Sequence, residues 1–569
     1  MANLRPILFM TLIFLAYMMW VEWQKDYGPK PQVETGNTTT SFDSSAVPGP
    51  AQAPDTSTGD LPQPGDADVV SPQTAAGPYV DTKAVMTGEN DLLIITTDVL
   101  ELGIDLTGGT VVSAQLLTYP VELKIPKQKV DLLRRSGPEM FIAQSGLLSR
   151  VAAPNHTSTY QTARMEYVLD QAADEIRVPL TWDDGNGIRV TKTFILKRGE
   201  YDVTVRHTLS NQSGQSWKGS SYEQLQIAVP EDKDTGGFTN PGRYSFFGLA
   251  FYSPDEKFEK IDFDDVASEP YQRSFSGGWL SVIQHYFFTA WIPRGDQVNA
   301  YSTQVYSPTG LPRYIVRAIS PGVDVSNGTS HEFESRLYVG PKLQDELETI
   351  APGLRYTVDY GIFTVFSKPL FWLLSKIHSV VNNWGWAILL LTVLIKMVFF
   401  KLTEAQYRSM ARMRKLQPRI EQLKERYGDD RQRLSQATME MYKKEKVNPL
   451  GGCLPILVQI PIFIALYWVL LESVELRQAP FILWIDNLSV RDPYFILPAL
   501  NAVFMILTQR LTPTAGMDPL QRKIMNFMPI GFSVMFAFFP AGLVLYWATN
   551  AGLSLAQQWY ITRKISAAG

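Results

Sequence analysis

The sequence is poor in the residues that usually carry catalysis or bind metal ions. It has one cysteine, Cys453, which excludes an internal disulfide and any cluster of cysteine ligands. Its five histidines are scattered, and no two of them have the spacing of metal ligands on a helix. A glycine-rich phosphate loop and the common nucleophile motifs are also missing. We therefore expect a protein that is not an enzyme and that uses no metal ion or cofactor.

Neither sign of charge dominates, since 52 Lys and Arg face 56 Asp and Glu among 569 residues. This balance gives no sign of nucleic-acid binding. The first two thirds of the chain are mostly polar, whereas long apolar runs fill the last third. Such a division is typical of a large water-exposed domain joined to a bundle of membrane helices.

The amino end predicts a transmembrane anchor at 1–23. About fifteen apolar residues end in Met-Met-Trp-Val-Glu-Trp, without the small residues of a signal-peptide cleavage site. Trp20 and Trp23 suit a membrane interface. A cleaved signal peptide is the alternative. Residues 24–80 are rich in Pro, Gly, Ser and Thr, and they predict a disordered linker.

Short runs of alternating apolar and polar residues predict an all-β domain at 81–350, most simply a sandwich. Two of these runs, 188–196 and 201–209, flank a Lys-Arg-Gly-Glu turn and predict a β-hairpin. At 360–383, apolar residues recur at helical spacing opposite a polar face. This segment predicts an amphipathic helix lying in the membrane interface, and a core helix of the β domain is the alternative.

Five apolar segments predict membrane-spanning helices at 384–402, 452–471, 493–510, 525–540 and 541–562. Between the first two, 401–448 holds thirteen Lys and Arg against seven Asp and Glu. The loop 511–524 and the short tail 563–569 also carry basic residues, whereas 472–492 is acidic. The positive-inside rule therefore predicts cytoplasmic basic loops, cytoplasmic termini and an external β domain.

The basic cytoplasmic segment 403–448 predicts a helical hairpin that breaks at Gly428-Asp429-Asp430, where an Asp can cap the second helix. Its charges either fix membrane topology alone or form a docking arm for an acidic partner such as ribosomal RNA or lipid headgroups. The candidate docking residues are Arg408, Arg412, Arg414, Lys415 and Arg419.

Lys396 lies inside the apolar run ILLLTVLIKMVFFKLT, where a charged side chain is costly unless it reaches water. It either extends toward the cytoplasmic interface or faces a hydrated cavity. Polar residues in the predicted spans favour the cavity. They are Thr392, one helical turn away, a stripe of Tyr546, Asn550, Ser554 and Gln557 in the last span, and the single amides Gln459 and Gln509.

No carboxylate stands at mid-span to pair with Lys396, which argues against a proton relay. A hydrated groove open to cytoplasm and lipid would instead lower the cost of bringing a polar peptide segment partway across the bilayer. The ammonium group would attract acidic residues of that segment.

Several segments, in order along the chain, resemble the YidC, mitochondrial oxidase-assembly and chloroplast Albino family of membrane protein insertases. In the last third they include LTEAQYRSMARMRKLQPRIEQLKERYGDD, KVNPLGGCLPILVQIPIFIALYW, DPLQRKIMNFMPIGF and FPAGLVLYWATN. SGGWLSVIQHYFFTAWIP and LYVGPKLQDEL in the β domain resemble the Gram-negative form. The resemblance covers nearly the whole chain apart from the linker.

The resemblance implies a six-span α-helical bundle, made of the N-terminal anchor and a five-helix core, with a large periplasmic β-supersandwich similar to sugar-mutarotase-like folds. It implies an inner-membrane protein that inserts and helps fold other membrane proteins through a hydrophilic groove. The groove charge falls on Lys396, where many relatives carry Arg. Client contacts fall on Thr392, Gln509, Tyr546 and Trp547, with Asn550 of the polar stripe beside them.

The resemblance also implies the partners. They are nascent inner-membrane proteins, the Sec translocon, the lipid bilayer and the ribosome, which would bind the cytoplasmic loops; no small-molecule substrate is expected. Two other functions stay open. A secondary transporter or channel would use the same lysine, although the sequence has no evident inverted repeat or paired acid. A sugar-binding enzyme would need a His/Glu constellation, but His331 and Glu332 point to opposite faces of a strand.

Overall fold

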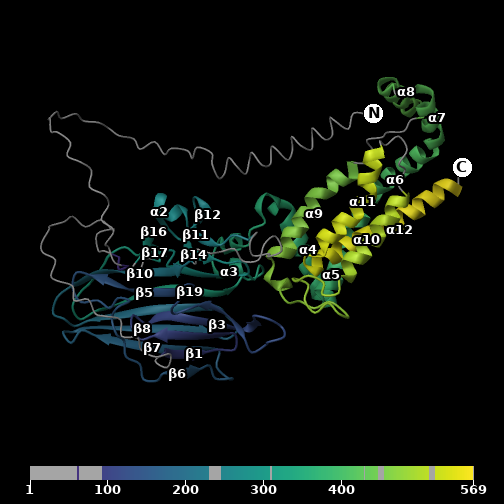
Figure 1. Cartoon of the computed structure of the whole chain (residues 1–569). Coiled ribbons are helices and arrows are strands. Elements are labelled where there is room, and N and C mark those ends of the chain that lie inside the picture. The colour runs from purple at the N-terminus through teal and green to yellow at the C-terminus, as the bar shows by residue number, and fades with distance from the viewer. Residues whose placement is uncertain are drawn as a thin grey trace, which may run out of the picture.

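The structure is a computed structural model that describes residues 60–62, 92–229, 245–307, 311–428, 430–445, 454–511 and 519–567. The expected anchor at 1–23 lies outside these residues, and so does the expected linker at 24–80 apart from 60–62. A part built of strands is followed by a part built of helices (Figure 1).

Within the described residues, the β domain consists of an eleven-stranded and an eight-stranded sheet. The first sheet contains β1 (Leu92–Thr96), β2 (Leu100–Asp105), β3 (Thr110–Pro120), β4 (Lys129–Leu133), β5 (Phe141–Ser149), β6 (Glu166–Val168), β10 (Trp217–Ala228), β13 (Gln272–Ser276), β16 (Val298–Tyr306), β17 (Arg313–Ile319) and β18 (Val323–Val325). The second contains β7 (Glu175–Asp183), β8 (Ile188–Lys197), β9 (Asp202–Asn211), β11 (Gly248–Ser253), β12 (Lys257–Ile261), β14 (Trp279–Ile283), β15 (Phe287–Pro293) and β19 (Ser330–Pro341).

The alternating pattern of the sequence matches the burial of the strands. In β9 every second residue is buried, and β8 and β9 pair antiparallel through the turn that contains Gly199. Gly199 has a φ of 73°, a conformation that favours glycine. The predicted hairpin is therefore confirmed. Residues from both sheets make up one apolar core, as expected for a sandwich.

A buried lysine joins the two sheets. Lys192 on β8 is 1% exposed, and its Nζ donates to the carbonyl oxygens of Gly108, Gly109 and Ser145 at 2.9, 2.8 and 3.1 Å. The three donors of an ammonium group thus meet three acceptors from the opposite sheet and the turn before β3. This arrangement offsets the cost of burying a polar group between two apolar surfaces.

The helical part contains nine helices among the described residues. They are α4 (Thr364–Val381), α5 (Trp384–Val398), α6 (Phe400–Lys415), α7 (Gln417–Tyr427), α8 (Arg431–Lys444), α9 (Leu454–Glu472), α10 (Ile496–Leu511), α11 (Pro519–Phe536) and α12 (Ala541–Ala567). The short helices α2 (Asp265–Ser268) and α3 (Leu347–Ile350) belong to the β domain. In Figure 1, α7 and α8 lie at the end of the helical part that is far from the β domain.

The helices differ from the expected spans at several ends. The segment expected at 384–402 is divided: α5 ends at Val398, and α6 begins at Phe400 after a bend of 67°. Conversely, α12 continues past the expected end of the last span to Ala567. By length and hydropathy, no single described helix qualifies as a bilayer span, whereas α5 and α6 qualify only as a bent pair.

Helix α4 packs on α5 and α9. Ser367 is fully buried, and its hydroxyl donates to the carbonyl oxygen of Ala465 at 3.1 Å. The opposite side of α4 exposes the apolar residues Val365, Trp372 and Val380. An exposed apolar face is compatible with the predicted position in a membrane interface. The contacts of α4 with other helices do not favour the alternative of a core helix of the β domain.

The end of α9 and the segment between α9 and α10 hold the β domain against the helices. Arg477 and Gln478 both donate to the carbonyl oxygen of Pro120 at the end of β3, at 2.9 and 3.0 Å. The Glu475 carboxylate accepts from the backbone N–H of Gln344 at 3.1 Å, and His285 lies 3.0 Å from the carbonyl oxygen of Leu471. These polar contacts fix the orientation of the two parts.

We expect the stability of the β domain to fall as the pH rises from about 4.5 to 7, because of Glu223 on β10. Burial raises the pKa of this carboxyl to about 7 from 4.5, against opposing effects of Ser335, Ser221 and Lys192. The folded state therefore holds a proton that the unfolded state releases in this range, and stability is lost until the folded group also ionises. Hydrogen exchange of β10, corrected for the intrinsic rate, measures the effect.

The matched variant is Glu223→Gln, which keeps the shape of the side chain and has no proton to lose. Its protection factors are expected to be higher than those of the wild type at pH 8 and to stay level between pH 4.5 and 7. An equal slope in both proteins would show that another group causes the pH dependence.

Candidate functional site

A cavity of about 490 Å³ with both polar and apolar lining residues lies between the helices that carry Lys396 and the polar stripe. Its described lining comes from six helices: Lys396 of α5, Thr403, Gln406, Tyr407 and Met410 of α6, Gln459, Ile460 and Phe463 of α9, Asn501, Met505, Thr508 and Gln509 of α10, Met525, Met528 and Pro529 of α11, and Tyr546, Trp547, Asn550, Ala551, Ser554 and Gln558 of α12. None of these residues is acidic.

Lys396 faces the last helix. Its Nζ donates to the hydroxyl of Ser554 at 2.7 Å, and this hydroxyl in turn donates to the backbone carbonyl oxygen of Asn550 at 2.7 Å. Among the described lining residues, neutral hydroxyl and amide groups are thus the polar neighbours of the ammonium group. The remaining two donors of the lysine are available to water or to a polar segment that enters the cavity.

A second polar contact joins α9 to α12. The Gln459 amide donates to Asn550 Oδ1 at 2.9 Å. Tyr546, Asn550 and Ser554 of the predicted stripe all line the cavity. The fourth member, Gln557, is not in the lining, and its neighbour Gln558 takes that place. The helical period therefore identified the lining face of α12 over about two turns.

Gln509 and Trp547 also line the cavity, whereas Thr392 does not. The Gln509 amide donates to the backbone carbonyl oxygen of Met525, which ties α10 to α11. The rings of Trp547 and Phe463 meet edge to face, with their centroids 4.4 Å apart. The indole N–H of Trp547 is buried and has no acceptor in the described part of the chain. Thr392 is 1% exposed and donates to the carbonyl oxygen of Ile388 in its own helix.

Several lining residues were not identified from the sequence. Thr403, Gln406 and Tyr407 fall in the predicted cytoplasmic segment, and the bend after α5 brings them to the cavity. Asn501 and Thr508 lie on α10, seven residues apart, so a search of this span for polar residues at helical spacing would have found them. Four methionines complete the lining: Met410, Met505, Met525 and Met528. Their flexible thioethers adapt to apolar surfaces of different shape.

The candidate docking residues lie on α6 and α7. Arg408 pairs with Glu404 at 2.7 Å, and Arg419 of α7 pairs with Glu445 at 2.5 Å, just past α8. Arg412 and Lys415 are exposed. Arg414 belongs to α6. The break at Gly428 and the cap of α8 by Asp430, which accepts from the N–H of Arg433 at 3.1 Å, confirm the predicted hairpin turn.

Comparison with known proteins gives the family. The model described as "YidC periplasmic domain" matches residues 93–373, and the model described as "60Kd inner membrane protein" matches 376–568. The membrane protein insertases YidC of Thioalkalivibrio sulfidiphilus and Nitrosococcus oceani are each 47% identical to this chain, over 577 and 573 residues, with 100% of both chains covered. That of Pseudomonas entomophila is 44% identical over 99% of this chain and 98% of its own.

A solved structure of an active YidC insertase, with the first transmembrane domain resolved, aligns with a TM-score of 0.39 at 19% identity, over 83% of this chain and 93% of that chain. The assignment to a family is based on the sequence matches. Together with the fold they define a class of bacterial inner-membrane proteins in which a strand-rich periplasmic domain precedes a helical part. The chain belongs to the YidC family of membrane protein insertases, which are not enzymes.

If water fills the cavity, a cysteine on its wall is expected to react with a charged maleimide, because only a hydrated thiol forms the reactive thiolate. In a protein with Cys453→Ser, we expect Thr508→Cys to be modified in membranes. Val503→Cys, on the same helix, is the matched control. Val503 is 51% exposed and is not in the lining, so lipid is expected to cover it. Equal labelling of both variants, or none at Thr508→Cys, would contradict a hydrated cavity. Mass spectrometry measures the modified fraction.

Proposed function

We propose that this insertase uses the cavity around Lys396 as the groove that receives client segments. The supporting observation is a single ammonium group among neutral hydroxyl and amide groups, with no acid in the described lining. A polar client segment would exchange its hydration for these groups at little cost, whereas hydrocarbon offers none. An acidic residue of the segment would gain the attraction of Lys396.

The methionines and aromatic rings of the same cavity suit the apolar part of a client. Met505, Met525 and Met528 lie on α10 and α11, Phe463 lies on α9 and Trp547 lies on α12. A client segment would thus meet polar groups, chiefly on α10 and α12, together with adaptable apolar groups in the same cavity. Because flexible thioethers adapt to different shapes, these apolar contacts would suit a client that stays briefly and is then released into lipid.

We also propose the topology predicted by the charges: six spans, cytoplasmic termini and a periplasmic β domain. The position of α7 and α8 at the end of the helical part far from the β domain supports this proposal (Figure 1). The ribosome as a partner of the basic hairpin and the Sec translocon as a second partner follow from the family resemblance.

A transporter or channel is less well supported by the same cavity. Ion-coupled transport through a membrane usually pairs a buried cation with an acid, and the described lining contains no acid. Liposomes that contain the protein without a client are therefore expected to hold a proton gradient as long as empty liposomes do.

The central test replaces Lys396 in purified protein in liposomes. We expect Lys396→Ala to reduce insertion of a single-span client with an acidic translocated tail by about tenfold, which corresponds to about 1.4 kcal/mol. Lys396→Arg should restore most of the activity because the charge is kept. Protease protection of the translocated tail measures insertion.

Two controls separate the groove charge from a general loss of charge. Lys401→Ala removes an exposed lysine five residues away and is expected to insert like the wild type. A client whose acidic tail residues are replaced by Asn should depend less on Lys396. Normal insertion of the acidic client by Lys396→Ala would mean that the polar groups of α10 and α12 carry the function without the charge.

Charge reversal in the hairpin tests the docking proposal. We expect Arg412→Glu combined with Lys415→Glu to weaken cosedimentation with ribosomes several-fold at low salt, because both side chains are exposed and would face phosphate groups. Lys376→Glu, an exposed lysine on α4, is the control and should have no effect. Unchanged cosedimentation of the double variant would leave the hairpin charges with a role in topology only.

A further inference from the structure

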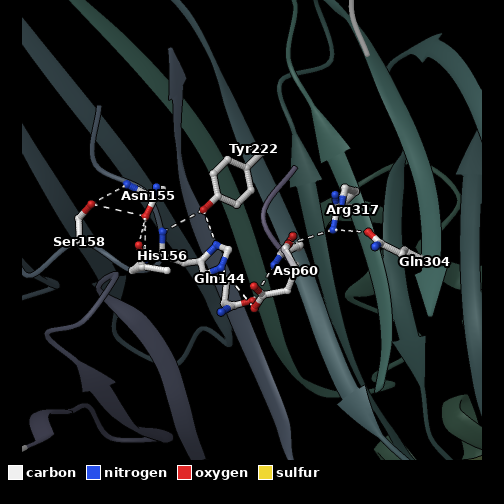
Figure 2. A network of polar contacts seen from close by, with 10 residues as sticks. Asp60, Gln144, Asn155, His156, Ser158, Tyr222, Gln304 and Arg317 are labelled. Carbon is white, nitrogen blue, oxygen red and sulfur yellow. Dashed lines mark hydrogen bonds and ion pairs between the residues drawn. The ribbon is translucent and has the colours of Figure 1, made fainter. Parts of the chain in front are cut away.

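A short segment of the expected linker lies on the first sheet of the β domain (Figure 2). The Asp60 carboxylate is 3.3 Å from Nε2 of His156, and Arg317 Nη2 donates to the backbone carbonyl oxygen of Asp60 at 3.1 Å. Leu61 packs against a small apolar cluster formed by Leu148, Tyr222 and Ile319. Pro62 is buried. Within two consecutive residues the segment thus contacts the β domain through a carboxylate, a backbone carbonyl oxygen and an apolar side chain.

The β domain holds the groups that meet Asp60 in place through contacts of its own. The hydroxyl of Tyr222 accepts from the backbone N–H of His156 at 2.9 Å and lies 2.6 Å from its Nδ1, which turns Nε2 toward Asp60. Arg317 on β17 also donates to the side-chain oxygen of Gln304 on β16 at 3.0 Å. Because side-chain and sheet contacts already orient His156 and Arg317, little freedom is lost when a ligand binds.

His156 and Arg317 are each 6% exposed, so water can hydrate them only in part. A buried cationic or polar side chain needs an acceptor nearby. The Asp60 carbonyl oxygen accepts from Arg317, and the Asp60 carboxylate lies 3.3 Å from Nε2 of His156. Burial by itself would raise the pKa of Asp60, but the interactions with His156 and Arg317 outweigh it, and the pKa is lowered. The carboxylate form therefore suits this position.

We propose that this surface is a peptide-binding site for an acidic residue followed by an apolar residue, and that Asp60–Leu61–Pro62 occupies it in cis. The site would recognise a carboxylate through His156, a backbone carbonyl oxygen through Arg317 and an apolar side chain through the cluster around Tyr222. Occupancy attaches the expected linker of 24–80 to the β domain about two thirds of the way along the linker. A partner protein that presents an Asp-Leu segment of the same chemistry would compete for the site.

A labelled peptide tests the site in the full-length protein in detergent. The peptide has the sequence of residues 56–66, TSTGDLPQPGD, and fluorescence anisotropy measures its binding. The wild type should bind weakly, because its own segment competes at a millimolar effective concentration. In the double variant Asp60→Ala, Leu61→Ser the site is free, and we expect binding that is at least about tenfold tighter.

Two controls accompany the test. The variant Asp66→Asn changes an acidic residue of the linker outside the segment and should bind like the wild type. A peptide with Asn in place of its first Asp should bind the double variant at least about tenfold more weakly. The proposal is overturned if the double variant fails to bind the peptide, if it binds no tighter than the wild type, or if both peptides bind equally. The two substitutions of the double variant lie in the expected linker and not in a strand, so the packing of the strands is expected to stay intact.

Discussion

The arrangement of the helices around the cavity depends on how one ammonium group, that of Lys396, is accommodated among apolar helices. Lys396 finds no acid in the described lining of its cavity, and its hydrogen bond goes to Ser554. Ser554 and Asn550 continue the polar contacts along α12, and Gln459 extends them to α9. These contacts link α5, α12 and α9 around a space that side chains do not fill. Closing that space would press the ammonium group against apolar side chains, which is costly because a buried charge needs polar partners.

The parts that the sequence predicted are those in which one local period governs burial. Alternation identified the β8–β9 hairpin, because each strand buries one face. The 3.6-residue period identified Tyr546, Asn550 and Ser554 as one face of α12. In both cases the residues that act together lie on one element, and no knowledge of distant contacts is needed.

The remaining parts depend on contacts between elements. Gln406 and Tyr407 reach the cavity because the chain bends at Phe399, and the apolar sequence through that position gives no sign of a break. Thr392 has the expected position along α5, yet its hydroxyl is satisfied by its own helix, which a one-turn spacing rule does not reveal. In the sequence, Lys192 looks like an ordinary polar strand residue. Its three carbonyl acceptors come from the turn before β3 and from the opposite sheet, and only the fold brings them together.

Several hydrogen bonds at the joint between the β domain and the helices have main-chain acceptors. Arg477 and Gln478 bind the carbonyl oxygen of Pro120, and His285 meets that of Leu471. Every amino acid presents the same carbonyl group, so residues at the accepting positions can be exchanged without loss of these bonds. The two parts can therefore diverge in sequence at different rates during evolution and still meet in the same orientation. Substitutions of the donors Arg477 and Gln478 have no such freedom.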